Sequence, residues 1–141
     1  MDFSLKNTYF QIACLNGHLN IVEFLWNLNQ NIDVHANNEY AFVWACENGH
    51  LNVVEFLWNL NQNIHIHSNN EYAFRWACAK GHLNIIEFLF SIDSQYFSEY
   101  IISENFYIIA EKINNSTNFD VYFHIENNIV KNYEFNSIIL K

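Results

Sequence analysis

The chain has 141 residues, 51% of them hydrophobic, which is enough apolar material for the core of one domain of ordinary size. Its 15 acidic residues outnumber its 6 lysine and arginine residues, and the formal net charge is -9 at pH 7. The basic residues are scattered, so no basic surface is expected, and an acidic surface repels nucleic-acid phosphates. Nucleic acid is therefore not an expected partner.

The first ten residues, MDFSLKNTYF, carry an acidic residue and no apolar run, unlike a secretory signal peptide. No stretch of the sequence approaches the ~18 continuous apolar residues of a membrane span. We therefore expect a soluble, intracellular protein with no membrane partner.

A period of 32 residues organises the sequence. The segment NGHLNIVEFLWNLNQNI at 16–32 returns as NGHLNVVEFLWNLNQNI at 48–64, and KGHLNIIEFLF follows at 80–90. Glycine, histidine and cysteine recur with the same period, at Gly17, Gly49 and Gly81, at His18, His50 and His82, and at Cys14, Cys46 and Cys78. Such repetition is typical of a solenoid, in which each unit packs on its neighbours.

Each unit predicts two helices and a loop. In the middle unit, residues 39–47 have apolar side chains at helical spacing, and Asn38 is the expected N-cap. A second, antiparallel helix is expected over 51–60, after a left-handed turn at Gly49. The polar segment NQNIDVHANN at 29–38 suits an extended loop or hairpin between successive helix pairs.

The glycine–histidine signature is absent beyond Phe90. Stepping the register once more places Phe106 and Ala110 on Phe74 and Cys78, which favours a degenerate fourth helix pair. We expect its second helix over 120–130 and expect the pair to cover the apolar face of the third unit, as terminal repeats do. Residues 131–141 receive no assignment.

The order helix, turn, helix, loop at this period resembles the ankyrin repeat, whose units carry the pattern A-A-x-x-G-H-x-x-V-V-x-x-L-L. The middle unit matches it with Ala45-Cys46, Gly49-His50, Val53-Val54 and Leu57-Trp58. The unit is one residue shorter than the usual ~33, and Tyr40-Ala41-Phe42-Val43 replaces the Thr-Pro-Leu-His opening. The resemblance therefore leaves the loop geometry open. The segments NNEYAF and NGHLNVVEFLW look like those of ankyrin proteins from giant DNA viruses that infect amoebae.

We therefore predict an all-α, ankyrin-type helix-turn-helix solenoid. Three clear repeats are expected in residues 1–95, as units of about 1–32, 33–64 and 65–95, with a degenerate C-terminal capping repeat and tail in 96–141. A monomer is expected.

The cysteines are expected to be buried and unpaired. They share one register position, and stacked helices lie ~8–10 Å apart, which exceeds the ~7 Å between Cα atoms that a disulfide allows. The same distances exclude a metal shared by His18, His50 and His82, which we expect to form local hydrogen bonds at the turns. His65 and His67 face one way on an extended loop, but no carboxylate or cysteine accompanies them in the sequence. We expect a solvated pair, and no metal.

The remaining conspicuous side chains also have structural explanations. Four tryptophans are expected as oversized core residues, with an aromatic recognition surface as the alternative: Trp26, Trp44, Trp58 and Trp76. The repeated glutamates Glu23, Glu55 and Glu87 are expected to form a solvated acidic stripe. The glycines are all used in turns, and no phosphate-binding loop or catalytic constellation is found. We expect no enzyme and no cofactor.

The resemblance implies a protein-binding scaffold with a concave surface formed by the first helices and loop tips. The stripe expected there in the second and third units, and assigned to partner binding, is Glu39, Val43, Glu47, Glu71, Arg75 and Ala79. The residues of this stripe differ between units, and the equivalent residues of the first unit, around Gln11, differ as well. Specialisation of the face and a recent tandem duplication would each explain this difference. A host protein is the expected partner if the viral resemblance holds, in which case the chain would act in the host cytoplasm. The alternative is a structural or vestigial fragment that binds no specific partner.

Overall fold

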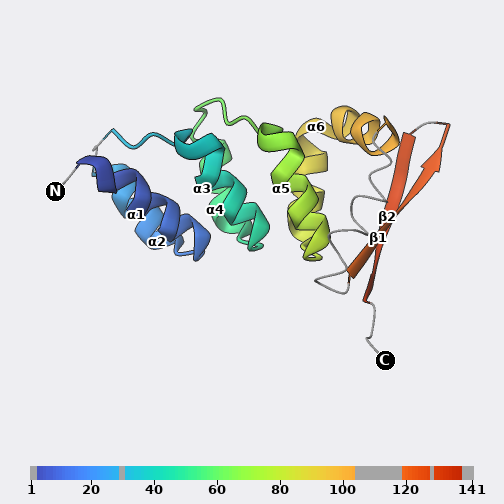
Figure 1. The fold of residues 1–141 in the computed structure, drawn as a ribbon, viewed down its shortest axis with the longest axis horizontal. Coiled ribbons are helices and arrows are strands. Elements are labelled where there is room, and N and C mark those ends of the chain that lie inside the picture. Colours follow the sequence, from blue (N-terminus) through green and yellow to red (C-terminus); the bar gives the residue numbers. More distant parts are fainter. Residues whose placement is uncertain (1–2, 29–30, 104–118, 128, 138–141) are drawn as a thin grey trace. The chain divides into compact units, whose positions relative to one another are not determined.

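The computed structural model describes residues 3–28, 31–103, 119–127 and 129–137. These residues form six helices and one two-stranded sheet (Figure 1). The helices are α1 (Phe3–Leu15), α2 (Leu19–Asn27), α3 (Ala36–Glu47), α4 (Leu51–Asn59), α5 (Ser68–Ala79) and α6 (Leu83–Ser103), and the strands are β1 (Phe119–Glu126) and β2 (Ile129–Ser137). The chain divides into two compact units, residues 1–73 and 74–141, with the boundary inside α5.

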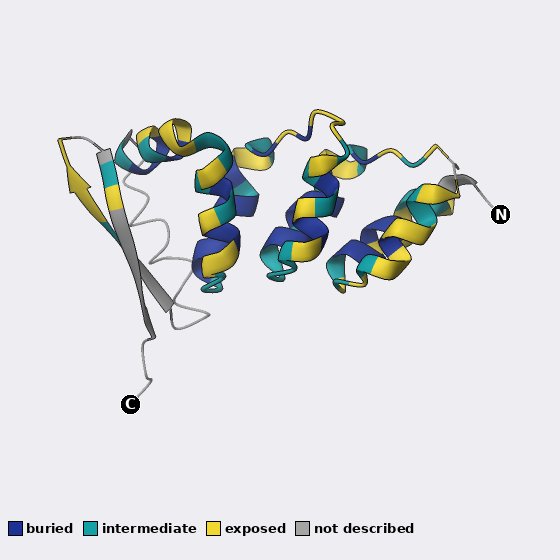
Figure 2. Ribbon diagram, turned by 180° about the vertical axis from the view of Figure 1, so that it is seen from behind, coloured by how far each residue is buried: buried dark blue, intermediate teal, exposed yellow. Residues whose placement is uncertain are grey.

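Helix pairs build the first unit. Helix α1 packs on α2 and α3 packs on α4, while α1 also contacts α3 and α2 contacts α4. The apolar residues at helical spacing are buried between these helices, with Phe10, Phe42 and Leu57 among the largest (Figure 2). The predicted all-α stack of helix pairs is confirmed.

A glycine turn joins the two helices of each pair, as predicted. Gly49 has a φ of 77°, its amide donates to the carbonyl of Cys46 at 3.2 Å, and the His50 amide donates to that of Ala45 at 2.9 Å. This bonding pattern is the Schellman motif, which satisfies carbonyls at the end of the first helix. A left-handed residue is required at its centre, and glycine takes that conformation without a steric cost from a Cβ atom.

The start of α3 differs from the prediction. Asn37, Asn38 and Glu39 all have positive φ values, of 58°, 60° and 66°, so they form a left-handed turn. Asn38 therefore lies inside this turn and not at an N-cap, and the backbone becomes helical only after Glu39. The start of α5 repeats the turn with Asn69, Asn70 and Glu71. Asparagine tolerates this conformation better than most residues, which explains the paired asparagines.

In the second unit, α6 contains two helical segments separated by Asp93, which has φ -155° and ψ 62°. The Asp93 carboxylate accepts a hydrogen bond from the Tyr96 amide at 3.3 Å, as an N-cap residue does. In the segment after Asp93, Phe97 is fully buried and stacks on Phe74 with ring centroids 4.6 Å apart. The helix that begins directly after Asp93 therefore packs on the third repeat, whereas the degenerate capping repeat in 96–141 stays a prediction.

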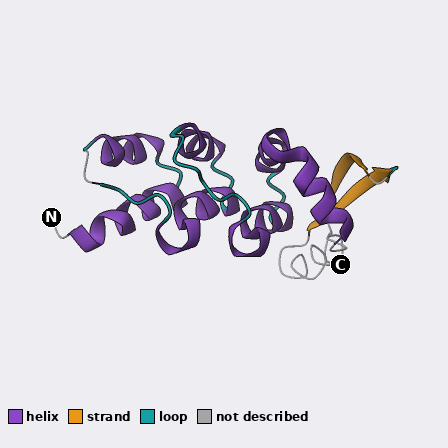
Figure 3. Cartoon of the chain, turned by 90° about the horizontal axis from the view of Figure 1, so that it is seen from above, coloured by secondary structure: helices purple, strands orange, loops and turns teal. Residues whose placement is uncertain are grey.

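Strands β1 and β2 pair in an antiparallel hairpin, so the helix predicted over 120–130 is wrong (Figure 3). Val121, Phe123 and Ile125 alternate with polar or aromatic residues, a period-two pattern that favours a strand. Asn127, with a φ of 52°, lies in the turn between the strands. The register positions Phe106 and Ala110 lie outside the described residues, and the boundary proposed near residue 95 remains a prediction.

Candidate interaction surface

The six residues assigned to partner binding are not a continuous exposed stripe. Glu39, Val43 and Glu71 are each 2% exposed and Ala79 is 0% exposed, so the expectation that these four face solvent is wrong. Only Glu47 and Arg75 are partly accessible.

The left-handed turns explain the burial of the two glutamates. Glu39 and Glu71 lie in these turns, and their carboxylates contact the histidines four residues earlier, His35 and His67. A regular helix that began at these glutamates would instead place them on the outward face, as the predicted stripe requires.

A register position that varies between repeats also has a structural role. Gln11 is 4% exposed, its amide nitrogen donates to the Ala36 carbonyl at 3.2 Å, and its amide oxygen accepts from Asn37 at 3.2 Å. Gln11 therefore ties α1 to the turn that begins α3. Variation at this position cannot by itself be read as specialisation of a binding face.

The accessible part of α3 is aromatic and acidic. The rings of Tyr40 and Trp44 stack with centroids 4.8 Å apart, and both residues are half-buried, as is Glu47. The Glu47 carboxylate accepts a hydrogen bond from the Tyr72 hydroxyl at 3.3 Å. Helical spacing places Tyr40, Trp44 and Glu47 on one face. Trp44 is therefore not a fully enclosed core residue.

The part of α5 that belongs to the second unit also carries an accessible aromatic residue. Trp76 is half-buried, and the Lys80 ammonium lies 5.6 Å from the centroid of its ring, within cation–π distance. Arg75 is adjacent in sequence and also half-buried. This helix therefore presents positive charge beside an aromatic ring.

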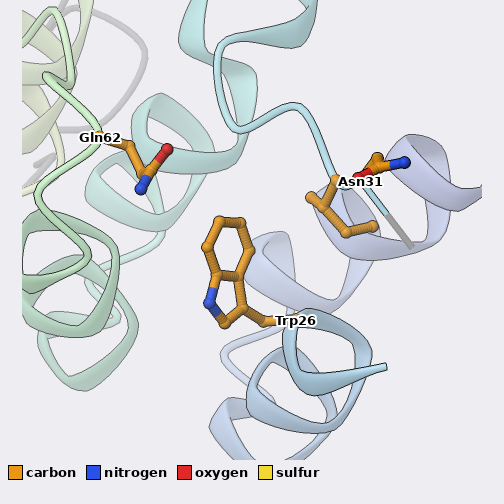
Figure 4. A pocket seen from close by; sticks show the side chains of 4 residues that line it. Trp26, Asn31 and Gln62 are labelled. Atoms are coloured by element: carbon orange, nitrogen blue, oxygen red, sulfur yellow. The ribbon is translucent and has the colours of Figure 1, made fainter. Parts of the chain in front are cut away.

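The tryptophans of the second helices line shallow pockets that recur with the repeat. Trp26, Asn31, Ile32 and Gln62 line a pocket of about 270 Å³, and Figure 4 shows the Trp26 ring between the segments that carry Asn31 and Gln62. A pocket of about 160 Å³ is lined by the equivalent Trp58, Asn63 and Ile64 together with Asn61. The exposed glutamates Glu23, Glu55 and Glu87 lie on these second helices, as the predicted acidic stripe.

The loops bring together three residues that the sequence analysis keeps apart. The Nδ1 atom of His35 contacts a carboxylate oxygen of Glu39, and the ring of His65 lies 5.5 Å from that of His35, centroid to centroid. One potential ligand atom from each residue lies within 4.8 Å of the others. Sequence reasoning pairs His65 with His67, whereas the structure places His67 on Glu71. The sequence signal for this cluster is the period itself. Because successive loops stack, residues about one period apart become neighbours.

The contact with Glu39 also changes the acidity of His35. The hydrogen bond to the Glu39 carboxylate raises the pKa of His35 above its ordinary value, partial burial opposes this, and the negative charges of Glu39 and Asp33 add to the increase. Asp33 also accepts a hydrogen bond from the His35 amide at 2.9 Å.

The family described as ankyrin repeats (3 copies) matches residues 10–99. The chain belongs to the ankyrin-repeat family. No curated protein and no solved structure gives a significant match. Ankyrin repeats generally mediate protein–protein interactions and are typically not enzymes. None of the described helices is long and apolar enough to cross a membrane.

The ankyrin repeats use their recurrent histidine and cysteine structurally. The His50 ring bonds through Nε2 to the Leu15 carbonyl at 2.9 Å, so it joins one repeat to the turn of the preceding one. All three cysteines are buried and unpaired, as predicted. Burial raises the pKa of Cys14 to about 12 and raises those of Cys46 and Cys78 as well. Their thiols are therefore protonated at neutral pH, whereas nucleophilic attack and metal ligation need the thiolate.

Proposed function

We propose that this ankyrin-repeat chain is a non-enzymatic scaffold that binds a partner protein through its first helices. The observation that carries the proposal is the stacked, half-exposed pair Tyr40 and Trp44 on α3, one turn from the Glu47 carboxylate. Family membership supports the class of activity, because ankyrin repeats generally mediate protein–protein interactions.

The chemistry of α3 suits a protein ligand. Tyrosine and tryptophan are enriched among residues that dominate interface affinity, because they bury a large area at a small cost in conformational entropy. Here each ring already restricts the other, so less side-chain freedom is lost on binding. Glu47 beside them favours a partner with an exposed lysine, arginine or amide.

Arg75 is the proposed main polar contact on α5. It stands at the register of Gln11 and Val43, and it is half-buried where Val43 is enclosed. A guanidinium group can hold a carboxylate by two parallel hydrogen bonds, and the adjacent Trp76 supplies apolar area. The proposed contact residues are thus Tyr40, Trp44 and Glu47 on α3, and Arg75 and Trp76 on α5.

The proposed class of partner, a host protein, rests on the resemblance of the repeat segments NNEYAF and NGHLNVVEFLW to those of giant-virus ankyrin proteins. We also propose that the chain acts as a monomer inside the cell. The competing proposal is a structural or vestigial fragment, which would fold in the same way and bind nothing specific.

Affinity capture from host lysate tests the proposal when three forms of the chain are compared. The test variant is Trp44→Ala with Glu47→Ala, and the matched control is Glu55→Ala, which removes an exposed carboxylate from α4. A protein that is captured by the wild type and the control, but lost with the test variant, supports binding through the first helices. Equal loss with both variants would place the surface elsewhere, and the absence of any protein captured specifically would favour the vestigial fragment.

A further inference from the structure

We propose that His35, Glu39 and His65 form a binding site for a divalent transition-metal ion, with Zn²⁺ as the best fit. The site lies where the loop before α3 meets the loop before α5. It is independent of the proposed partner-binding surface, and neither the sequence analysis nor the family assigns it.

The geometry brings three ligands of suitable type together. One donor atom from each residue lies within 4.8 Å of the others. Ligands on one tetrahedral Zn²⁺ lie ~2.0–2.2 Å from the metal, so their donor atoms are roughly 3.5 Å apart. Closing the site requires a movement of about an ångström, which rotation of the exposed His65 side chain can supply.

The Glu39 carboxylate is incomplete without a further partner. Glu39 is 2% exposed, one of its carboxylate oxygens contacts His35, and the other, Oε2, is buried with no hydrogen-bond partner among the described residues. A buried carboxylate oxygen without a partner is costly, because the group loses hydration and gains nothing in return. A bound cation would remove this cost.

The next repeat provides an internal comparison, because it has the same histidine–glutamate pair. There the Nδ1 atom of His67 lies 2.9 Å from one oxygen of Glu71 and 3.0 Å from the other, so both oxygens face the histidine. The pair by itself is therefore a recurrent structural feature of the left-handed turn. The oxygen without a partner occurs in the copy that has a second histidine beside it.

When the repeats are aligned by their period, all three ligand types occur together at one junction between repeats. The residue equivalent to His65 is Asp33 one period earlier and Phe97 one period later. The residues one period before His35 and Glu39 are Phe3 and Asn7, and the Asn7 side chain accepts a hydrogen bond from the Asp33 amide at 2.9 Å. Neither neighbouring junction can thus supply two histidines and a carboxylate.

The types of ligand select the class of ion. Imidazole nitrogens favour zinc, copper and nickel over magnesium and calcium, and two imidazoles with one carboxylate are a known zinc set that leaves a position for water. A metal bound here would join two successive loops, which the bond from the Ser68 hydroxyl to the Asn38 carbonyl at 3.4 Å already brings side by side. Binding to the folded chain alone would raise its melting temperature.

Calorimetric titration of the full chain with Zn²⁺ alone tests the site. The test variant is His65→Asn, which removes the exposed third ligand, and the matched control is His67→Asn, which removes the histidine of the pair that lacks a third ligand. We expect the wild type and the control to bind one ion with equal affinity, and the test variant to bind about tenfold or more weakly. Zn²⁺ should also raise the melting temperature of the wild type and the control, and not that of the test variant.

Two results would overturn the site: the absence of Zn²⁺ binding by the folded wild type, or equal affinities for the wild type and His65→Asn. Circular dichroism shows whether each variant is folded. Should His65→Asn fail to fold, Co²⁺ binding to the unaltered chain decides the question. Intense visible bands of a tetrahedral Co²⁺ complex that Zn²⁺ abolishes support the site, and the spectrum of the hydrated ion alone overturns it.

Discussion

Gly17 provides a test of how one repeat packs on the next. Its φ is +72°, and a Cβ atom added there would lie 2.6 Å from Cγ of the His50 ring. That ring is held in place by its hydrogen bond to the Leu15 carbonyl at 2.9 Å. Substitution Gly17→Ala therefore has two costs, a left-handed backbone in a residue with a Cβ atom and a displaced histidine.

The expected loss of stability is the sum of the cost of the left-handed backbone and the cost of displacing the His50 ring. The left-handed conformation costs a non-glycine residue about 1–2 kcal/mol. Moving the His50 ring breaks its hydrogen bond, which costs about 0.5–1.5 kcal/mol. We expect Gly17→Ala to lower the free energy of unfolding by about 1.5–3.5 kcal/mol in total. Asn59→Ala, at an exposed position of α4, is the control and should change stability by less than ~0.5 kcal/mol.

Urea unfolding followed by circular dichroism measures these values, and a double-mutant cycle with His50→Ala separates the terms. In the His50→Ala background the steric conflict is gone, so Gly17→Ala should cost only about 1–2 kcal/mol. An equal cost in both backgrounds would show that the His50 ring is not the obstacle. A cost below ~0.5 kcal/mol in the wild type would show that the turn itself is wrongly placed.

Three further predictions concern the cysteines, the middle turn and the partner. Triple substitution of Cys14, Cys46 and Cys78 by alanine should keep the helical circular dichroism and lower stability by no more than a few kcal/mol. Unfolding by a reductant alone would contradict unpaired thiols. Because burial raises their pKa values, the stability of the wild type, but not of this variant, should fall as the pH rises above about 8.5, where only the unfolded chain loses thiol protons. Gly49→Val should lower stability by more than ~1 kcal/mol, and an unchanged melting temperature would refute the left-handed turn. Arg75→Glu should raise the dissociation constant of the partner more than Glu55→Arg does, and the reverse order would place binding on the second helices.

The sequence predicts the helical repeats well, because the features that define them are local and recur. The apolar positions at helical spacing and the glycine turns all lie where the register places them. The glycine prediction rests on a physical requirement, since the turn needs a positive φ that glycine alone adopts freely. Three copies of each signal make the assignment secure even where single residues differ.

The left-handed turns and the hairpin could not be predicted in the same way. Three consecutive non-glycine residues with positive φ are costly alone, and at Asn37–Glu39 the contact of Glu39 with His35 and the bond from Asn37 to Gln11 offset part of this cost. These contacts become visible only when the repeats are stacked. The helix predicted over 120–130 rests on the repeat register alone, whereas the strand-like alternation of that segment favours the observed hairpin.

The candidate site shows what a difference between repeats can mean. Gln11 differs from Val43, and the difference serves a bond between repeats, whereas Trp44 remains accessible at a position that sequence alone assigns to the core. His65 replaces the equivalent Asp33, and this acquires chemical meaning because His35 and Glu39 stand beside it in the preceding loop. In a stacked chain, the surroundings of a residue are set by the equivalent positions of its neighbours as much as by its own sequence. A substitution in one repeat can therefore create a site only where the adjacent repeat already supplies the other ligands. The proposed metal site is for this reason expected between the loops that precede α3 and α5, and at neither neighbouring junction.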